Sequence, residues 1–406
     1  MIFYKEINFK ESPLGKIPSD WSIQRLKDVC ETVKGKKPAV LFDEGGENYL
    51  PYLTAEYMRT NSNVKWCKKD DPNVVWVSRN DLIMIWDGSY SGDVFFGFEG
   101  ALASTMIKIL PKEKLDKGFL YYFLSTRSNF LRETTSGTGI PHVSKSVFEN
   151  LLVPFPPIEE QRVIAGVLGV VDSVIAKTDE VIAKTERLKK GLMQTLLTRG
   201  IGHKEFKETE IGKIPKAWQV TKLGNRELTE IIMGQSPPSS AYNKEGDGLP
   251  FLQGKMEFGE IYPSPVLYCS QPIKIAEQND ILMSVRAPVG DVNVAPYKLC
   301  IGRGLAAIRF NSEKADSWFY FYYFQKIKNF LEKIGKGSTF KAITKDDLEN
   351  LKIPYPPPSE QRRIAEILSN VDRKLEIERN EKAKLERIKR GLMDLLLTGK
   401  IRVRAD

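Results

Sequence analysis

The chain has 406 residues and a formal net charge of +9, and 41% of its residues are hydrophobic. No window approaches the roughly 18 consecutive apolar residues that a membrane-spanning helix needs, so no membrane span is expected. Two histidines and four scattered cysteines argue against a metal centre. The length allows two sizeable domains. The opening MIFYKEINFK lacks a signal-peptide pattern, so we expect a cytoplasmic protein.

The chain contains an internal duplication. Residues 152–198 and 352–398 align without a gap, so that Glu160-Gln161-Arg162 falls on Glu360-Gln361-Arg362. The segments 12–29 and 209–226 also match, through Gly-Lys-Ile-Pro followed by a tryptophan. We interpret that entry as a turn that leads into a buried indole. The repeated unit is therefore about 200 residues long, a globular part followed by a long helix.

Each copy of the duplicated segment has apolar residues at three-and-four spacing, typical of a helix with one buried face. Proline and glutamate near each start favour a helix N-terminus, and Ser359 is a candidate cap. Gly200 and Gly399 are suited to end the helices. We predict that residues 158–197 and 358–397 pack as one antiparallel coil, with the globular parts at opposite ends. The alternative is that each helix packs only on its own globular part.

Matching strands in the two globular parts run into polar loops. Residues 81–85 and 280–284 are predicted strands, and the loops after them share Gly-Asp-Val but differ in the residues before it. The shared motif with a divergent tip indicates two related sites with different targets, although ordinary loop drift explains it about as well. The aromatic segments 119–130 and 318–330 are predicted as core helices rather than as platforms for base stacking.

A glycine-rich loop follows each aromatic helix. Residues 136–145 and 336–345 combine glycines, hydroxyl side chains and lysines, a mixture that suits close contact with phosphate. A plain glycine turn is the alternative. The sequence has no Gly-x₄-Gly-Lys-Ser/Thr loop, no GxGxxG and no Asn-Pro-Pro-Tyr. Without a catalytic cluster, a chain of two similar units is expected to bind rather than to catalyse.

The doubled layout resembles the specificity subunit of type I restriction–modification systems. The resemblance rests on Pro-Phe-Pro-Pro-Ile-Glu-Glu-Gln-Arg and Pro-Tyr-Pro-Pro-Pro-Ser-Glu-Gln-Arg, which open the two long helices, and it covers essentially the whole chain. The second copy departs from it at residues 337–341, where the Pro-His pair of the first copy is missing.

The resemblance implies an α+β fold with a pseudo-two-fold internal repeat and a non-catalytic chain. Two mixed α/β target recognition domains, each reading one half of a bipartite double-stranded DNA sequence, are joined by two long helices that form an antiparallel coiled coil. The helices would also dock two methyltransferase subunits, and restriction subunits would join that core. S-adenosylmethionine would belong to the partner, and no cofactor is expected here. The expected segments are recognition domains at 1–155 and 201–355, and long helices at 156–200 and 356–406.

Candidate contact residues lie in or beside the divergent loops and at the helix junctions. Arginine pairs with guanine in a two-pronged fashion, so Arg286 is the candidate for a base edge, while lysines are expected to meet phosphates. The DNA-binding candidates are Lys36, Lys37, Ser89, Tyr90, Gly137, Thr138, His142, Lys145, Gln235, Arg286, Arg303, Ser338, Thr339, Lys341 and Lys345. The partner-binding candidates are Glu160, Gln161, Arg162, Glu360, Gln361 and Arg362.

Two other classes of function stay open from the sequence. A structural coiled-coil adaptor would show no salt-dependent affinity for DNA, and an enzyme with an unfamiliar site would show turnover by the isolated chain. The identity of the DNA target depends on the geometry of a few loop side chains.

Overall fold

The structure is a computed structural model that describes residues 2–134, 141–336 and 342–404. Contacts divide the chain into two compact units, Met1–Asp179 with Asn380–Asp406, and Glu180–Arg379. We call them unit 1 and unit 2. Each unit contains one globular part together with half of each long helix. The segment boundaries expected from the repeat divide the chain differently and stay a prediction.

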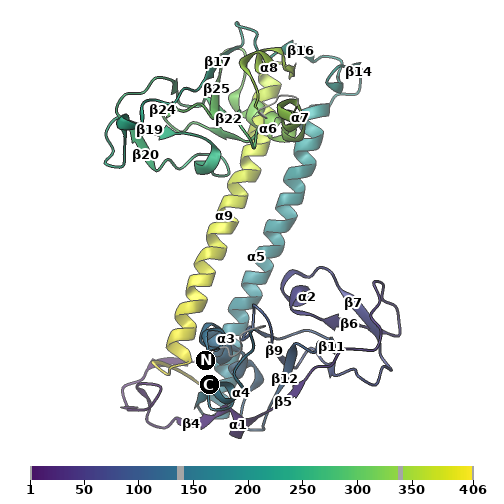
Figure 1. The fold of residues 1–406 in the computed structure, drawn as a ribbon, viewed down its shortest axis with the longest axis vertical. Helices are drawn as coiled ribbons and strands as arrows, with labels where there is room; N and C mark the ends of the chain where they lie inside the picture. The colour runs from purple at the N-terminus through teal and green to yellow at the C-terminus, as the bar shows by residue number, and fades with distance from the viewer. Residues whose placement is uncertain (1, 135–140, 337–341, 405–406) are drawn as a thin grey trace. The chain divides into compact units, whose positions relative to one another are not determined.

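The main sheet of unit 1 is antiparallel and packs against the aromatic helix (Figure 1). Apolar residues of its two central strands, such as Leu82 and Ile109, share one buried cluster with Phe119 and Phe123 of that helix. The aromatic segment is therefore core, as predicted. The strands, in spatial order, are β10 (Val94–Phe95), β9 (Leu82–Ile85), β12 (Met106–Pro111) and β5 (Cys30–Lys34), and the helix is α3 (Lys117–Glu133).

A second, smaller sheet packs on the other side of β9. Ile83 and Ile85 alternate with the residues that face α3, and they join the buried cluster of the small sheet. A strand with two buried faces explains the continuous apolar run that follows Asp81. The small sheet has the order β7 (Lys65–Lys68), β6 (Tyr49–Leu53), β11 (Gly100–Leu102) and β8 (Trp76–Val77), and α2 (Ala55–Thr60) follows β6.

Unit 2 repeats this plan with local differences. Its aromatic segment forms two helices that meet at Ile327 rather than the single helix expected over 318–330. Residues 319–324 are all buried, so this helix is surrounded by core. The main sheet is β17 (Thr229–Met233), β25 (Leu305–Phe310), β22 (Ile281–Ser284) and β23 (Val292–Val294). The small sheet is β18 (Tyr242–Asn243), β20 (Leu267–Cys269), β19 (Leu249–Leu252), β24 (Leu299–Ile301) and β21 (Ile275–Ala276), and the helices are α6 (Ser317–Lys326) and α7 (Lys328–Lys336).

The Gly-Lys-Ile-Pro entry forms a hairpin in each unit and places a tryptophan in the core, as predicted. Trp21 and Trp218 are both 0% exposed. The Trp21 indole donates to Glu160 over 3.2 Å, and the Trp218 indole donates to Glu360 over 2.9 Å. The hairpins are β2 (Phe9–Lys10) with β3 (Ile17–Pro18), and β14 (Phe206–Thr209) with β15 (Gly212–Pro215). The two-stranded sheets that follow are β4 (Ser22–Arg25) with β13 (Leu152–Phe155), and β16 (Gln219–Lys222) with β26 (Lys352–Tyr355).

The two duplicated segments are long helices, α5 (Ile158–Arg199) and α9 (Pro358–Leu396). Gly200 and Gly399 follow them with φ of 63° and 69°, the left-handed conformation that glycine adopts at helix ends. Ser359 lies inside the first turn of α9, so its candidacy as the cap is wrong. The end of the chain is also not helical, because a strand, β27 (Ile401–Arg404), follows α9.

Inside each unit the two long helices run antiparallel. In unit 1, Lys389 pairs with Asp172 over 2.6 Å, and Lys382 pairs with Asp179 over 2.7 Å. From the first pair to the second, the residue number rises along α5 and falls along α9. The two helices therefore run in opposite directions. In unit 2, Lys189 pairs with Asp372 over 2.5 Å in the same way. The antiparallel pairing is therefore present within each unit, and the placement of the globular parts at opposite ends stays a prediction.

A tyrosine of the aromatic helix binds the aspartate of one such ion pair in each unit. The Tyr122 hydroxyl donates to Asp172 over 2.8 Å, and the Tyr322 hydroxyl donates to Asp372 over 2.7 Å. Burial raises the pKa of both tyrosines, so their hydroxyls stay protonated and keep donating. The same three-residue contact thus binds the aromatic helix and both long helices in each unit.

The single buried stripe predicted along each helix is not continuous. Val174, Val181 and Leu188 are 40%, 36% and 54% exposed, while Thr178 and Thr185 are buried. The seam between two paired helices is narrow, and charged pairs at its edges occupy part of the space beside it. Apolar side chains that lie outside the seam therefore face solvent. Apolar residues on α9 behave alike, because Ile388 is 52% exposed.

The two ends of the chain meet in unit 1, where β1 (Ile2–Lys5) pairs antiparallel with β27 (Figure 1). Arg402 of β27 is buried and donates to Glu160 and Glu6 over 2.6 Å each, and to Asp20 over 2.8 Å. Burial opposes its charge, but the hydrogen bonds to the three carboxylates outweigh burial and raise the pKa of Arg402. The guanidinium therefore stays charged and neutralises the two buried carboxylates, Glu6 and Glu160.

We expect Arg402→Gln to destabilise the chain by about 3–5 kcal/mol, because it leaves buried carboxylates without their charged partner. The neighbouring Arg404→Gln, at an exposed position of the same strand, is the matched control and should cost little. Thermal unfolding followed by circular dichroism measures both. Equal melting temperatures for the two variants would show that the buried charge cluster is dispensable.

Candidate nucleic-acid interface

Three loops of unit 1 meet beside the main sheet, and we call residues 35–38, 86–93 and 141–144 loop cluster 1. The Gly88 amide donates to the Pro141 carbonyl over 2.8 Å, and the Val143 amide donates to the Trp86 carbonyl over 2.9 Å. Lys34, the last residue of β5, pairs with Asp87 over 3.0 Å. The structure thus brings together the sequence-predicted residues Lys36, Lys37, Ser89, Tyr90 and His142.

The corresponding loops of unit 2 also meet, and we call residues 234–238, 285–291, 302–304 and 342–344 loop cluster 2. The Val285 amide donates to the Gly304 carbonyl over 3.0 Å, and the Ile343 amide donates to the Val285 carbonyl over 2.8 Å. The Arg303 amide donates to the Ser236 hydroxyl over 3.2 Å. Three more sequence-predicted residues, Gln235, Arg286 and Arg303, therefore lie in one cluster.

A glycine at the start of one loop allows a close backbone approach in each unit. A Cβ on Gly35 would lie 2.1 Å from the Ala103 carbonyl oxygen, and one on Gly234 would lie 2.2 Å from the Gly302 carbonyl oxygen. No side chain fits there without a backbone shift. The side chains that follow in the chain, Lys36 and Gln235, are exposed. The fixed backbone therefore presents variable side chains to solvent.

The remaining predicted residues lie next to the clusters. Lys145 and Lys345 are exposed first residues of α4 (Lys145–Glu149) and α8 (Lys345–Asn350), and each pairs with the glutamate four residues later over 3.6 Å. Exposed pairs of this kind are weak and exchange readily with other anions. Their contact with phosphate stays a prediction. Five predicted residues lie outside the part of the chain that the structure describes, and they are Gly137, Thr138, Ser338, Thr339 and Lys341.

The shared Gly-Asp-Val motif has a structural role in both units. Asp93 hydrogen-bonds Arg132 of α3 and lies 3.9 Å from Arg59 of α2. In unit 2, Asp291 pairs with Lys328 of α7 over 2.5 Å and hydrogen-bonds Lys255 from η2 (Lys255–Glu257). Burial acts against ionisation of Asp291, but hydrogen bonds from the two lysines outweigh it and lower the pKa.

The aspartate therefore links the small sheet to the aromatic helix in both units. Sequence reasoning did not select its cationic partners Arg59 and Lys255. These two residues come from segments that align only weakly between the two halves. The recurrence of Gly-Asp-Val was therefore the only feature of the sequence that could have indicated a contact there.

The Glu-Gln-Arg motif at each helix start is held mainly by contacts within its own unit. Gln161 and Gln361 are 0% exposed. Each accepts from the amide of the aspartate that caps the aromatic helix, over 2.8 Å for Asp116 and 2.9 Å for Asp316. Glu160 and Glu360 accept from the entry tryptophans. These contacts give the motif an internal structural role, and partner binding through it stays a prediction that concerns the exposed Arg162 and Arg362.

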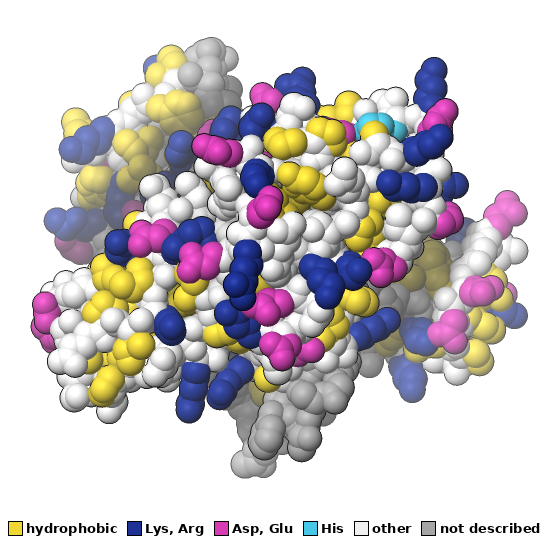
Figure 2. Space-filling model, turned by 90° about the horizontal axis from the view of Figure 1, so that it is seen from above, with side chains coloured by type: hydrophobic (Ala, Val, Ile, Leu, Met, Phe, Trp, Pro, Cys, Tyr) yellow, Lys and Arg dark blue, Asp and Glu magenta, His cyan; other side chains and the backbone are white. Residues whose placement is uncertain are grey.

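The positive charge is not gathered into one field on the face that Figure 2 shows. Lysine and arginine side chains alternate there with aspartate and glutamate. Among the described residues no cluster of His, Cys, Asp or Glu is arranged to hold a metal ion. None of the helices in the described part of the chain is both long and apolar enough to cross a membrane.

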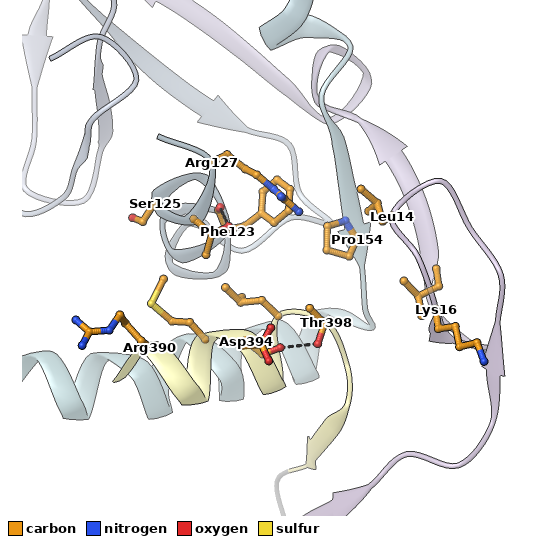
Figure 3. A pocket seen from close by; sticks show the side chains of 13 residues that line it. Leu14, Lys16, Phe123, Ser125, Arg127, Pro154, Arg390, Asp394 and Thr398 are labelled. Carbon is orange, nitrogen blue, oxygen red and sulfur yellow. Dashed lines mark hydrogen bonds between the residues drawn. The ribbon is translucent and has the colours of Figure 1, made fainter. Parts of the chain in front are cut away.

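A separate hollow in unit 1, of about 390 Å³, lies beside the end of α9. Figure 3 shows Arg127 from α3, Arg390 and Asp394 from α9, and Lys16 from the entry hairpin around it. Its lining shares no residue with loop cluster 1. We assign it no part in recognition of DNA bases.

The family comparison covers most of the chain. The model described as the type I restriction modification DNA specificity domain matches residues 18–187 and 215–387, one copy for each half of the repeat. The type I restriction enzyme MjaVIII specificity subunit of Methanocaldococcus jannaschii is 38% identical, over 100% of this chain and 98% of the relative. The MjaX specificity subunit of the same organism is 42% identical, over 99% and 98%.

Comparison with solved structures leads to the same family as comparison with sequences. A structure reported for complex assembly and conformational transition of the type I R-M system is 32% identical, with a TM-score of 0.57, and covers 95% of this chain and 99% of that one. The type I restriction–modification S subunit from M. genitalium has a TM-score of 0.65 at 17% identity, over 96% and 99%, which shows a shared fold. The repeated fold and its loop clusters thus define a DNA specificity protein with two recognition domains. The chain belongs to the family of type I restriction–modification specificity subunits.

Two kinds of interaction should be separable by mutation. Arg286→Ala is expected to relax preference at one base pair, by an amount on the order of 1–3 kcal/mol, because arginine pairs with a guanine edge. The double change Lys36→Ala and Lys37→Ala should weaken binding to all sequences and reduce the slope of log affinity against log salt, by about 0.9 for each phosphate that is no longer neutralised. Gel shifts at several salt concentrations measure both.

Arg226→Ala is the control for this prediction, since Arg226 is an exposed arginine outside both loop clusters. It should leave sequence preference intact. An Arg286→Ala protein with unchanged affinity and unchanged preference would show that Arg286 does not contact a base.

Proposed function

We propose that loop cluster 1 and loop cluster 2 each read one half of a bipartite double-stranded DNA target. One observation carries the proposal: the same backbone arrangement occurs twice, with exposed side chains that differ between the copies. The exposed residues include Lys36 and Tyr90 in the first cluster, and Gln235 and Arg286 in the second. Two copies of one backbone with different tips are suited to read two different sequences.

The long helices act in this proposal as the spacer between the half-sites and as the docking surface for two methyltransferase subunits. Leu188 and Ile388 occupy equivalent positions of the repeat, and they are 54% and 52% exposed. Large apolar side chains exposed at equivalent points of two helices are suited to bind two copies of one partner. Ion pairs such as Lys389 with Asp172 hold the helix pair together independently of these side chains.

The remaining roles follow from the family. Restriction subunits would join the complex of this chain with the methyltransferases in the cytoplasm. The methyltransferase would hold S-adenosylmethionine and carry out the chemistry, while this chain selects the sequence. We assign no catalytic step to its residues.

The test is selection of bound duplexes from a random pool by the full chain assembled with methyltransferase subunits. We expect two short conserved sequences separated by an unread spacer of fixed length. The full chain without the methyltransferase is compared in a salt-dependent gel shift. Binding without sequence preference would favour a structural adaptor over a specificity subunit.

Insertion of one heptad into both helices should lengthen the preferred spacer. Seven residues between Asp179 and Glu180, and seven between Arg379 and Asn380, keep the apolar spacing. They add about 10.5 Å of helix, which corresponds to about three base pairs of DNA. The same seven residues between Glu245 and Gly246, in an exposed turn of the small sheet, are the control. A folded double insertion that still selects the original spacer would show that the helices do not set it.

Leu188→Asp and Ile388→Asp should each remove one methyltransferase subunit, and the double change should remove both. A carboxylate in an apolar contact is expected to weaken docking by at least tenfold, because the charge loses its water. Val170→Asp is the control, since Val170 is 64% exposed but aligns with Asn370 in the other copy. Mass measurement of the intact complex gives the stoichiometry. A double variant that still carries two methyltransferases would place docking elsewhere.

A further inference from the structure

We propose that Arg59, on α2 of the small sheet in unit 1, is a base-reading residue that selects guanine in the half-site of loop cluster 1. The inference rests on the proposed function of that cluster. Arg59 precedes the divergent loop by about 30 residues of sequence, so its place in the sequence does not indicate a contact with that loop. Only the folded chain places its side chain against Tyr90, which lies in the loop cluster.

The guanidinium of Arg59 is held in a fixed orientation from two directions. Its central carbon lies 3.2 Å from the centre of the Tyr90 ring, so the planar group packs on the ring face. Its Nε lies 3.9 Å from a carboxylate oxygen of Asp93, and this ion pair sets which edge of the guanidinium faces Asp93. Tyr90 is itself 44% exposed. A guanidinium held in this way loses little freedom on binding.

Local structure explains why Arg59 points to the loop cluster. Thr54 caps α2 by accepting from the Tyr57 amide over 3.2 Å, and Asn61 ends the helix in the left-handed conformation, with φ of 53°. Met58 is 6% exposed and anchors the helix in the core of the small sheet. The next residue is therefore turned away from that core, and the Arg59 side chain is 35% exposed.

The hydrogen-bonding capacity of Arg59 is unused. Within the described part of the chain its N–H groups donate to no protein acceptor at hydrogen-bonding distance, and Asp93 is hydrogen-bonded by Arg132 instead. A guanidinium that is stacked on one face keeps its edge free. Two parallel N–H groups match the O6 and N7 acceptors of guanine in the major groove. The arrangement therefore has the chemistry of a preorganised guanine reader.

Among the residues that the structure describes, unit 2 has no equivalent of the stacked Arg59 guanidinium at its shared aspartate, so the stacking is not simply part of the repeated fold. The corresponding cation is Lys255, which hydrogen-bonds Asp291, so its ammonium serves the internal contact. Lysine also lacks the paired donors that match a guanine edge. The two recognition domains thus use the same aspartate but differ in the cation beside it, as expected of domains that read different half-sites.

The test repeats the selection of bound duplexes with Arg59→Lys and Tyr90→Ala in the full chain with its methyltransferases. Arg59→Lys keeps the charge but removes the paired donors. We expect it to lower the preference for guanine at one base pair of one half-site by about ten- to a hundredfold. Tyr90→Ala removes the stacking surface and should reduce the same preference, while Tyr90→Phe should retain it.

The half-site read by unit 2 is the internal control for folding, and its selected sequence should not change. Arg79→Lys, at an exposed arginine paired with Glu99, is the control for a charge-preserving change and should match the wild type. An Arg59→Lys protein with unchanged half-sites, or with affinity reduced equally for all sequences, overturns the inference alone. A wild-type complex that selects no sequence overturns the proposed function, and the inference with it.

Discussion

The attachment of each long helix to its recognition domain depends on two polar side chains, buried or half-buried, in the first turn of the helix. Gln161 and Gln361 bind the loop that caps the aromatic helix, and Glu160 and Glu360 bind the entry tryptophan. A buried carboxylate is tolerated only where donors surround it. Arg402 supplies a charged donor in unit 1, and His203 hydrogen-bonds Glu360 over 2.9 Å in unit 2. The orientation of helix and globular part is therefore fixed by directional hydrogen bonds in addition to apolar packing.

Other buried or half-buried carboxylates in each unit also bind side chains from more than one element. Asp172 and Asp372 accept from a tyrosine of the aromatic helix and pair with a lysine of the opposite long helix. Asp93 and Asp291 join the small sheet to the aromatic helix. Each carboxylate binds two partners from different elements, so a small number of residues determines how the loops lie relative to the helices of their own unit.

Different residues hold the backbone and form the loop tips, which explains how a repeated fold is suited to recognise two sequences. The contacts that hold the backbone are buried or half-buried and recur in both units. The side chains at the loop tips are exposed and differ, so they are free to change without loss of the fold. Arg59 packs on Tyr90 in one unit and Lys255 hydrogen-bonds Asp291 in the other, so the cation beside the shared aspartate has a different role in each unit.

The duplication, the two long helices, the aromatic core helix and the burial of the entry tryptophans could all be predicted from the amino-acid sequence. These features depend on local periodicity and on matches between the halves, which a single sequence contains. Loop residues such as Tyr90 and Arg286 could also be selected in this way, because divergence beside a shared Gly-Asp-Val is visible in the alignment of the halves. Contact of these residues with DNA remains a prediction.

Only the tertiary structure determines which side chains contact one another. The packing of Arg59 on Tyr90 joins segments about 30 residues apart, and the contact of Arg402 with Glu160 joins the end of the chain to its middle. The exposure of Val174 and Leu188 likewise follows from tertiary packing. Helical spacing shows which residues share a face, whereas the width of the seam with the second helix determines how much of that face is covered. Contacts between distant segments depend on the whole chain, and no local pattern encodes them.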